Sequence, residues 1–429
     1  MKFDCVIIGG GISGLTCGIR LASEGLSCAV ISAGMSALHF SSGSIDLMGF
    51  DETGATITRP LEYLESFVGS CPSHPYARCG VDTIREALLF FTDALKAEGL
   101  DVGGNGERNH FHITSLGTTK PTYLSQESVF NETFRAVPGS AMRVAVLNFE
   151  GYRDFYPEMA INNLKRLEDF RKVEFVTGRL VFPDYGDSER NPFEYRSIDI
   201  ARIFDTEKYL PDLARQIKKA ADGASVAGIP GFLGINNYKK HLAAIREMSG
   251  VGLYEIPTLP PSILGMRIDN ALKSRFAALG GVFIAGDRVT GGLVSGGKLQ
   301  CVYTKNNGSS PIEARDYVLS AGSFFSGGLT ADSAAVSEPV FGLKTRYASD
   351  RRDWRSEKFF SPATHPFLEF GVETDGLLRP APGSTGVPVE NLYCAGAILS
   401  GYNPVREGSG SGVAISTGYR AAINILAGR

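Results

Sequence analysis

Residues 5–15 read CVIIGGGISGL, an apolar run that leads directly into a glycine-rich turn. Gly9, Gly11 and Gly14 stand in G-x-G-x-x-G spacing. In such a turn the first glycine permits a tight bend, the second lets a pyrophosphate approach the backbone, and the third lets a helix pack closely on a strand. The stretch therefore predicts a nucleotide-binding turn at the start of the chain.

The sequence after this turn supports the same interpretation. The segment ISGLTCGIRLASEG, residues 12–25, is typical of a helix, and residues 28–31 form a second apolar run. Free N–H groups at the helix start, at Ile12 and Ser13, would face the phosphates together with the positive end of the helix dipole. Strand, turn, helix and strand in this order predict a Rossmann-like α/β fold.

Composition excludes several classes of partner. The 429 residues carry a formal net charge of −3 and contain no long basic run, so we expect no nucleic acid partner. No stretch of about 20 apolar residues is present, so we expect no direct membrane span. The seven cysteines show neither C-x-x-C pairs nor iron–sulfur spacing, so we expect no metal site in a reduced cytoplasmic protein.

The C-terminal sequence provides a second glycine motif. Residues 388–403, PVENLYCAGAILSGYN, read as a strand and a turn at Gly396, and residues 406–428 read as a loop and a small-residue helix. A flavoprotein aims the N-terminus of such a helix at the pyrimidine end of the isoalloxazine ring. Gly410 and Gly412, followed by Val413, would leave bare backbone for the ring. Close packing of helix on sheet is the alternative explanation.

Two further segments fit a flavin site. A strand ends at Ala321 and Gly322 and resembles the strand end that passes the nucleotide in flavoproteins of the glutathione-reductase type. Residues 280–289, GGVFIAGDRV, look like a ribityl-binding motif, but the next residues predict a hairpin rather than a helix. Val289 would still flank an adenine.

Two positions depart from the pattern for an adenine dinucleotide. Ser32 stands at the end of the second strand, where a carboxylate is expected on the ribose hydroxyls. Ala397 stands where an aspartate usually holds the ribityl chain. Both anchors are weakened, which leaves FMN as well as FAD open as the flavin.

The middle of the chain predicts a second α/β layer. Strands and helices alternate from residue 142 to residue 258, as expected for parallel strands. We therefore expect a discontinuous flavin-binding domain of residues 1–60 and 262–429, with residues 61–261 inserted as a cap or partner-docking domain.

Four stretches resemble a known family. They are MSALHFSSGSIDL at 35–47, TLPPSILGMRI at 258–268, SAGSFFSGGL at 320–329 and FGVETDGLLRP at 370–380. With the two glycine motifs, they make nearly the whole chain similar to the B subunits of bacterial anaerobic glycerol-3-phosphate dehydrogenases, which are fumarate-reductase-like flavoproteins.

The resemblance implies a subunit that carries FMN and works with a larger FAD-containing catalytic subunit and an iron–sulfur subunit. The complex would lie peripherally at the inner membrane through its partners, oxidise glycerol 3-phosphate to dihydroxyacetone phosphate and pass electrons to quinone.

The resemblance also suggests site residues. Arg406 and His365 lie near positions where fumarate-reductase-like enzymes keep catalytic or substrate-binding groups. The flavin-lining candidates between the second strand and residue 44 are His39, Ser41, Ser42 and Gly43. Arg346, Arg351 and Arg352 form a basic cluster, for which a phosphate site, a partner face and a solvated face all remain open.

Three functions remain open from the sequence. The first is the flavoprotein subunit of such a complex. The second is a stand-alone flavin-dependent dehydrogenase or reductase of a small anion, with Arg406 as the clamp. The third is a structural subunit that kept the fold but lost its cofactor.

Overall fold

A computed structural model describes residues 1–129, 142–183, 191–361, 364–382 and 389–429. The chain forms two compact units. Unit 1 comprises Met1–Ala37, Ile45–Leu100 and Asp269–Arg429, and unit 2 comprises Leu38–Ser44 and Asp101–Ile268. The predicted insertion, residues 61–261, differs from unit 2 in two places: residues 61–100 fold with unit 1, and residues 38–44 fold with unit 2.

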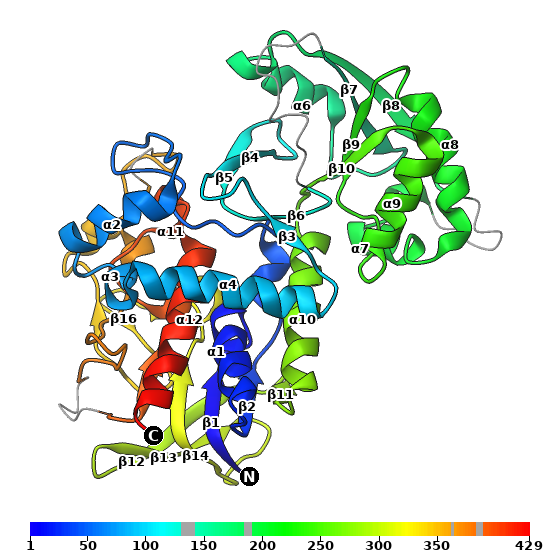
Figure 1. Ribbon diagram of the computed structural model, residues 1–429. Coiled ribbons are helices and arrows are strands. Elements are labelled where there is room, and N and C mark those ends of the chain that lie inside the picture. The colour runs from blue at the N-terminus through cyan, green and yellow to red at the C-terminus, as the bar shows by residue number, and fades with distance from the viewer. Residues whose placement is uncertain (130–141, 184–190, 362–363, 383–388) are drawn as a thin grey trace. The chain divides into compact units, whose positions relative to one another are not determined.

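Unit 1 is built on a seven-stranded sheet with the order β11-β2-β1-β14-β13-β12, in which β19 also pairs with β14 (Figure 1). The strands β11, β2, β1, β14 and β19 run parallel, whereas β12 and β13 form an antiparallel hairpin. A ligand of such a sheet binds beyond the carboxyl ends of the parallel strands, near the point where the strand order reverses. The strands are β1 Lys2–Ile8, β2 Cys28–Ser32, β11 Val282–Ala285, β12 Val289–Ser295, β13 Lys298–Thr304, β14 Ile312–Leu319 and β19 Leu392–Cys394.

Helices α1 and α12 pack side by side on this sheet, and α4 packs beside α12 (Figure 1). The apolar positions of α4, spaced three and four residues apart, are the ones that are buried. This packing explains why residues 61–100 belong to unit 1. The helices of unit 1 are α1 Ile12–Ser23, α2 Pro60–Ser70, α3 Pro75–Cys79, α4 Val81–Ala97, α11 Pro404–Glu407 and α12 Gly410–Ala427, and α10 Ile263–Ala278 leads into it from unit 2.

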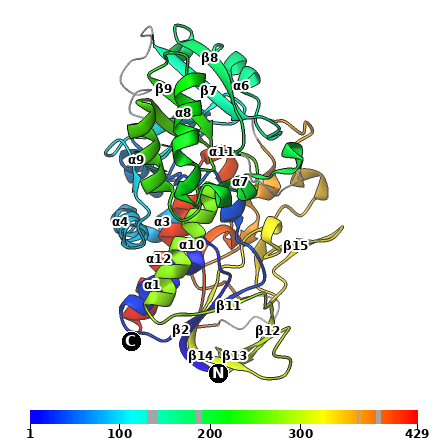
Figure 2. The ribbon, with the colours of Figure 1, turned by 90° about the vertical axis from the view of Figure 1, so that its right-hand side faces the viewer.

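Unit 2 contains the predicted parallel layer, a four-stranded sheet with the order β10-β9-β7-β8. Helices α8 and α9 lie on one side of this sheet and α6 on the other (Figure 2). The elements are β7 Arg143–Phe149, α6 Pro157–Leu164, β8 Glu174–Leu180, α7 Ser197–Ile203, α8 Leu210–Ala220, β9 Val226–Pro230, α9 Tyr238–Ser249 and β10 Gly252–Ile256.

Short strand pairs complete both units. Unit 2 adds β3 Val102–Gly103 paired with β6 Ser125–Gln126, and β4 His110–Ile113 paired with β5 Thr119–Thr122. Unit 1 adds β15 Thr330–Ala331 paired with β16 Val336–Ser337, and β17 Thr345–Arg346 paired with β18 Gly371–Val372.

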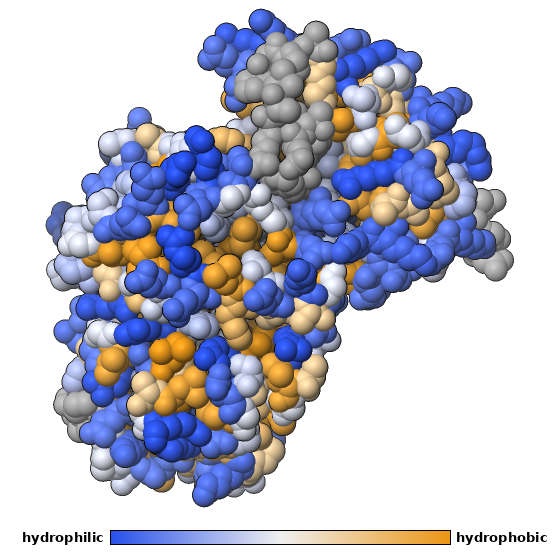
Figure 3. Space-filling model, viewed as in Figure 1, coloured by the Kyte–Doolittle hydropathy of each residue, from blue (hydrophilic) through white to orange (hydrophobic). Residues whose placement is uncertain are grey.

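Three features bear on the kinds of site that the described residues can form: the apolar surface, the hydropathy of the helices and the grouping of metal-ligating side chains. Apolar residues on the visible face of unit 1 are interspersed with polar ones (Figure 3). Within the described ranges, no helix has the length and hydropathy needed to cross a membrane. The same residues contain no group of three or more His, Cys, Asp or Glu side chains that could hold a metal ion.

Candidate flavin site

The N-terminal glycine turn has the geometry that its spacing predicts. Gly9 has φ +119°, and a Cβ there would lie 2.2 Å from the Ser320 carbonyl oxygen. A Cβ on Gly14 would lie 2.1 Å from the Gly9 carbonyl oxygen. A Cβ on Gly11, in contrast, would meet nothing within 4 Å among the described residues. Gly9 and Gly14 are thus required by packing, whereas Gly11 borders open space at the start of a helix.

The N-terminus of α1 is available to a ligand. None of the described side chains caps it, and Gly11 at the N-cap has an extended backbone with φ −83° and ψ −174°. The first N–H groups of a helix have no partner within the helix, and they attract phosphate together with the dipole. The turn therefore fits the phosphates of a flavin nucleotide on geometric grounds.

The end of β14 lies against the same turn. The Ser320 hydroxyl donates to the carbonyl oxygens of Ile8 at 3.2 Å and Gly9 at 3.1 Å. Ala321 and Gly322 follow directly, and Gly322 has φ +82°. The structure thus brings the predicted strand end to the glycine turn.

The C-terminal motif also packs on α1. Gly396, with φ +77°, lies so close to Ser13 that a Cβ there would be 2.3 Å from the Ser13 hydroxyl oxygen. Its N–H donates to the Thr417 hydroxyl of α12 at 2.9 Å. Ala397, next to it, is exposed. Two motifs separated by most of the chain therefore meet at Ser13.

The start of α12 differs from the prediction at Gly412. A Cβ on Gly412 would lie 2.2 Å from the Tyr76 phenol oxygen, and the Gly412 N–H donates to the Asp46 carbonyl oxygen at 2.8 Å. Protein atoms thus occupy the space that we assigned to a ring, and Gly412 serves close packing. Gly410 is more open, because a Cβ there would have the Pro404 Cβ, at 3.3 Å, as its nearest contact, and Val413 is buried.

The two candidates for the adenosine half of the flavin, Ser32 at the end of β2 and Val289 at the start of β12, are both buried. The Ser32 hydroxyl donates to the Gly34 carbonyl oxygen at 3.0 Å, so it already has an acceptor in its own loop. Val289 is buried at the start of β12. The β12–β13 hairpin after Asp287 confirms that this segment does not continue as a helix.

The segment 38–44 is organised by unit 2. Gly43 has φ +69°, and its carbonyl oxygen accepts a hydrogen bond from the Gln126 side chain at 3.2 Å. The Ser42 hydroxyl accepts from the Lys120 ammonium group at 3.1 Å. The neighbouring candidates bond mainly to backbone: the Ser41 hydroxyl donates to Leu38 O, and the His39 carbonyl oxygen accepts from Ser262 N.

His112 completes this group and was missed in the sequence. Its Nδ1 lies 3.1 Å from the Ser44 hydroxyl oxygen, and its Nε2 is buried without a hydrogen-bond partner among the described residues. Burial, and next the positive charge of Lys120, lower the pKa of His112 to about 3. The ring is therefore neutral at physiological pH. The alternation of His110 and His112 along β4 is the only sequence signal, and it does not specify a partner.

The two predicted catalytic residues lie on segments that contact each other. The Asn403 side chain donates to the Thr364 hydroxyl at 2.7 Å, which joins the N-cap of α11, the short helix of Arg406, to the residue before His365. The exposed Arg406 guanidinium donates to the Glu52 carbonyl oxygen at 2.6 Å.

Both ring nitrogens of His365 are used within its own loop. Nδ1 accepts from the Ser356 N–H, and Nε2 faces the Phe359 carbonyl oxygen, each at 3.0 Å. This geometry favours a structural role for His365.

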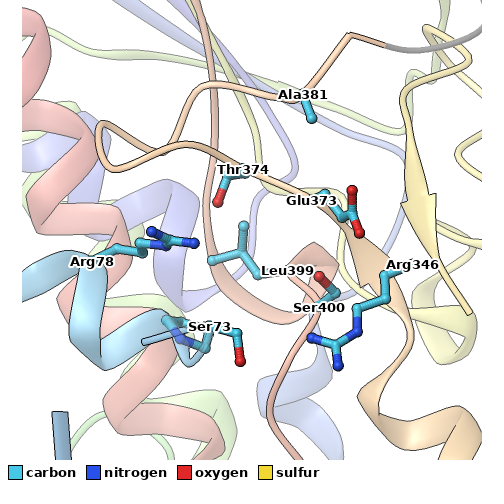
Figure 4. A pocket seen from close by; sticks show the side chains of 9 residues that line it. Ser73, Arg78, Arg346, Glu373, Thr374, Ala381, Leu399 and Ser400 are labelled. Carbon is cyan, nitrogen blue, oxygen red and sulfur yellow. The ribbon is translucent and has the colours of Figure 1, made fainter. Parts of the chain in front are cut away.

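A separate pocket of about 230 Å³ lies within unit 1 (Figure 4). Arg346, from the predicted basic cluster, lines it together with Arg78. The other two arginines of the cluster are engaged elsewhere, because Arg352 pairs with Asp350 at 2.6 Å and Arg351 lies over the Trp354 ring at 4.3 Å.

Comparisons with known proteins define the class. Residues 4–413 match the family described as FAD binding domain. The chain belongs to this family and is a flavoprotein with a Rossmann-like fold.

Curated relatives define the family more closely. The chain is 39% identical to the B subunit of anaerobic glycerol-3-phosphate dehydrogenase from Aliivibrio fischeri, over 99% of its own length and 96% of the relative's. It is 40% identical to the corresponding protein of Vibrio vulnificus, covering 98% and 95% of the two chains. The chain is a member of the family of anaerobic glycerol-3-phosphate dehydrogenase B subunits.

Among solved structures, the 3-ketosteroid Δ1-dehydrogenase of Sterolibacterium denitrificans aligns over 100% of both chains at 12% identity and a TM-score of 0.47.

Proposed function

We propose that this chain is the flavoprotein subunit of a complex that oxidises glycerol 3-phosphate to dihydroxyacetone phosphate and delivers the electrons to quinone. The observation that carries the proposal is the similarity of 37–40% identity to B subunits over nearly the whole chain. The open approach to Gly11, between two glycines that packing requires, supports a bound flavin nucleotide.

The residues of unit 1 divide the work of holding the flavin. Gly11 and the first N–H groups of α1 hold the phosphates, and the ends of β14 and β19 border the same turn. When bound, the flavin supplies the redox chemistry by accepting the electrons of the alcohol and passing them on. Because the Ser32 hydroxyl is engaged and Ala397 offers no carboxylate, an adenosine half has few side-chain anchors here. FMN therefore remains a candidate beside FAD.

We further propose two partners, a larger FAD-containing catalytic subunit and an iron–sulfur subunit, with attachment to the inner membrane through them. In the proposed complex, iron–sulfur clusters on another subunit would carry the electrons from the flavin towards quinone. Among the described residues no three or more Cys, His, Asp or Glu side chains gather in a group that could hold a metal, so these residues offer no iron–sulfur site.

The test is reconstitution. The chain, co-expressed with its candidate partners, is assayed for reduction of a quinone analogue by glycerol 3-phosphate, with the complex lacking this chain as the control. We expect quinone reduction only when this chain is present. A complex without it that reduces quinone at the same rate would contradict the proposal. Rapid turnover by this chain alone would instead support the stand-alone dehydrogenase.

A further inference from the structure

We propose that the Arg78–Arg346 pocket of unit 1 binds a small phosphorylated polyol. The phosphate would lie between the two guanidinium groups, and a hydroxyl would donate to Glu373. None of the predicted flavin-binding or catalytic residues lines this pocket, whereas Arg346 of the predicted basic cluster does.

The two arginines of the pocket are not engaged by other described residues. Neither Arg78 nor Arg346 forms an ion pair, a side-chain hydrogen bond or a ring contact with any described residue. Their side chains approach the pocket from opposite sides (Figure 4). An arginine presents several N–H donors in a planar fork that matches phosphate, so two such forks facing one pocket form an anion site.

The rest of the pocket lining includes several polar side chains. Hydroxyl groups of Ser73 and Thr374 lie beside the arginines, and Ser400 lines the pocket with a hydroxyl that donates to the Val372 carbonyl oxygen (Figure 4). Glu373 lines the same pocket, and its carboxylate lies 2.7 Å from the Lys344 ammonium group. The net formal charge of this region is +2, from three positive side chains, Arg78, Arg346 and Lys344, and one negative side chain, Glu373. A dianion is attracted, while the carboxylate accepts a hydrogen bond only from a ligand that also carries a donor such as a hydroxyl.

The walls of the pocket are built from hydrogen-bonded elements. Arg346 lies on β17, opposite Gly371 of β18. The Ser400 N–H and hydroxyl both donate to the Val372 carbonyl oxygen, at 3.1 and 3.2 Å. This wall is therefore held by backbone hydrogen bonds between three chain segments.

The opposite wall is α3, which carries Arg78. Its N-cap, His74, is buried and accepts from the Tyr76 N–H at 3.0 Å through Nδ1, while Nε2 lies 3.2 Å from Glu407. Both ring nitrogens of this histidine are therefore engaged, which holds the N-terminal end of α3, the helix that carries Arg78.

The size of the pocket limits the ligand. About 230 Å³ is below the usual range for drug-sized ligands and suits a molecule of a few carbons with one phosphate. We choose glycerol 3-phosphate as the probe because it is the substrate in the proposed function, so this choice rests on that function. The more general assignment, a small phosphorylated polyol, rests only on the lining and the size of the pocket.

The experiment is calorimetric titration of the purified full chain with glycerol 3-phosphate, inorganic phosphate and glycerol. We expect glycerol 3-phosphate to bind more tightly than inorganic phosphate, and glycerol not to bind. Arg78→Gln and Arg346→Gln should each weaken glycerol 3-phosphate binding about tenfold or more. Arg171→Gln, which removes the same charge from an exposed site in unit 2, should leave it unchanged.

Glu373→Gln separates the two parts of the ligand. Removal of this negative charge should leave phosphate binding unchanged or tighter, while the preference for glycerol 3-phosphate over phosphate falls. Equal affinity of the native chain for the two ligands would overturn the polyol assignment. Binding that survives both arginine changes, or no binding at millimolar ligand, would overturn the site.

This result is independent of the proposed redox function. Binding heat is measured on the chain without partners, whereas the proposed function is tested by flavin content and by quinone reduction in the complex. A chain that retains flavin but does not bind the ligand refutes only the pocket, and a colourless chain that binds it refutes only the redox function.

Discussion

Replacing Gly11 with valine should remove flavin binding while leaving the fold intact. A Cβ at this position meets nothing within 4 Å, and φ −83° is accessible to any residue. The free energy of unfolding of the flavin-free protein should therefore change by less than about 1 kcal/mol. The valine side chain would instead occupy the space through which a phosphate reaches the N-terminus of α1.

The expected loss of affinity follows from the hydrogen bonds at stake. A charge-assisted hydrogen bond contributes about 1.5–3 kcal/mol, so losing two of them raises the Kd for flavin about a hundredfold or more. The assay is a fluorescence titration of flavin-free protein with FMN and FAD, with urea unfolding of each variant alongside.

Two glycine variants serve as matched controls. Gly69→Val places the same side chain in open space on α2 and should bind flavin normally. Gly14→Ala should destabilise the protein by about 1–3 kcal/mol, because its Cβ would lie 2.1 Å from the Gly9 carbonyl oxygen. Normal flavin affinity in a folded Gly11→Val protein would refute the assignment of the phosphates to this turn.

Three other predictions concern single side chains. Burial holds the pKa of His112 at about 3 in the folded protein, whereas its ordinary value is 6.5. Below pH 6.5 the unfolded state therefore takes up a proton that the folded state does not. As the pH falls from 7.5 to 5, this difference should lower the free energy of unfolding by about 2 kcal/mol. His112→Asn should flatten this dependence in urea unfolding at several pH values, and an unchanged slope would exclude a buried neutral ring. Arg267→Met should lower the free energy of unfolding, measured with urea, by about 3–5 kcal/mol, because it leaves the buried Glu255 carboxylate without its partner. In the native protein the two side chains are buried together with N–O distances of 2.6 and 3.0 Å. A decrease of less than about 1 kcal/mol would contradict this prediction. Arg406→Ala should retain flavin and slow electron transfer in the assembled complex, and a normal rate would show that Arg406 has no part in electron transfer.

The local elements of the flavin site were predictable because the sequence signals are local. The apolar strand, the spacing of three glycines and the helix after them all lie within 25 residues, and the structure reproduces each one. The hairpin after Asp287 was recognised for the same reason, from its glycines and alternating residues. The meeting of Gly396 with Ser13 was expected only through the flavoprotein pattern.

The remaining features depend on contacts between distant residues. The apolar stripe of α4 predicts that one face is buried, but not that α12 buries it, so residues 61–100 were assigned to the insertion. Gly412 was read as open backbone because nothing in the sequence places Tyr76 beside it. Arg78 and Arg346 face one pocket only because α3 and β17 fold together, and an arginine in isolation is usually a solvated charge.

The central claim is that this chain carries a flavin, and the most direct test is the visible absorption spectrum of the purified chain. Heat release and mass identification of the bound molecule complete the measurement. We predict a yellow protein that releases FMN or FAD, with FMN consistent with the weak adenosine anchors at Ser32. A colourless chain that neither flavin can reconstitute would contradict the account and leave a structural subunit.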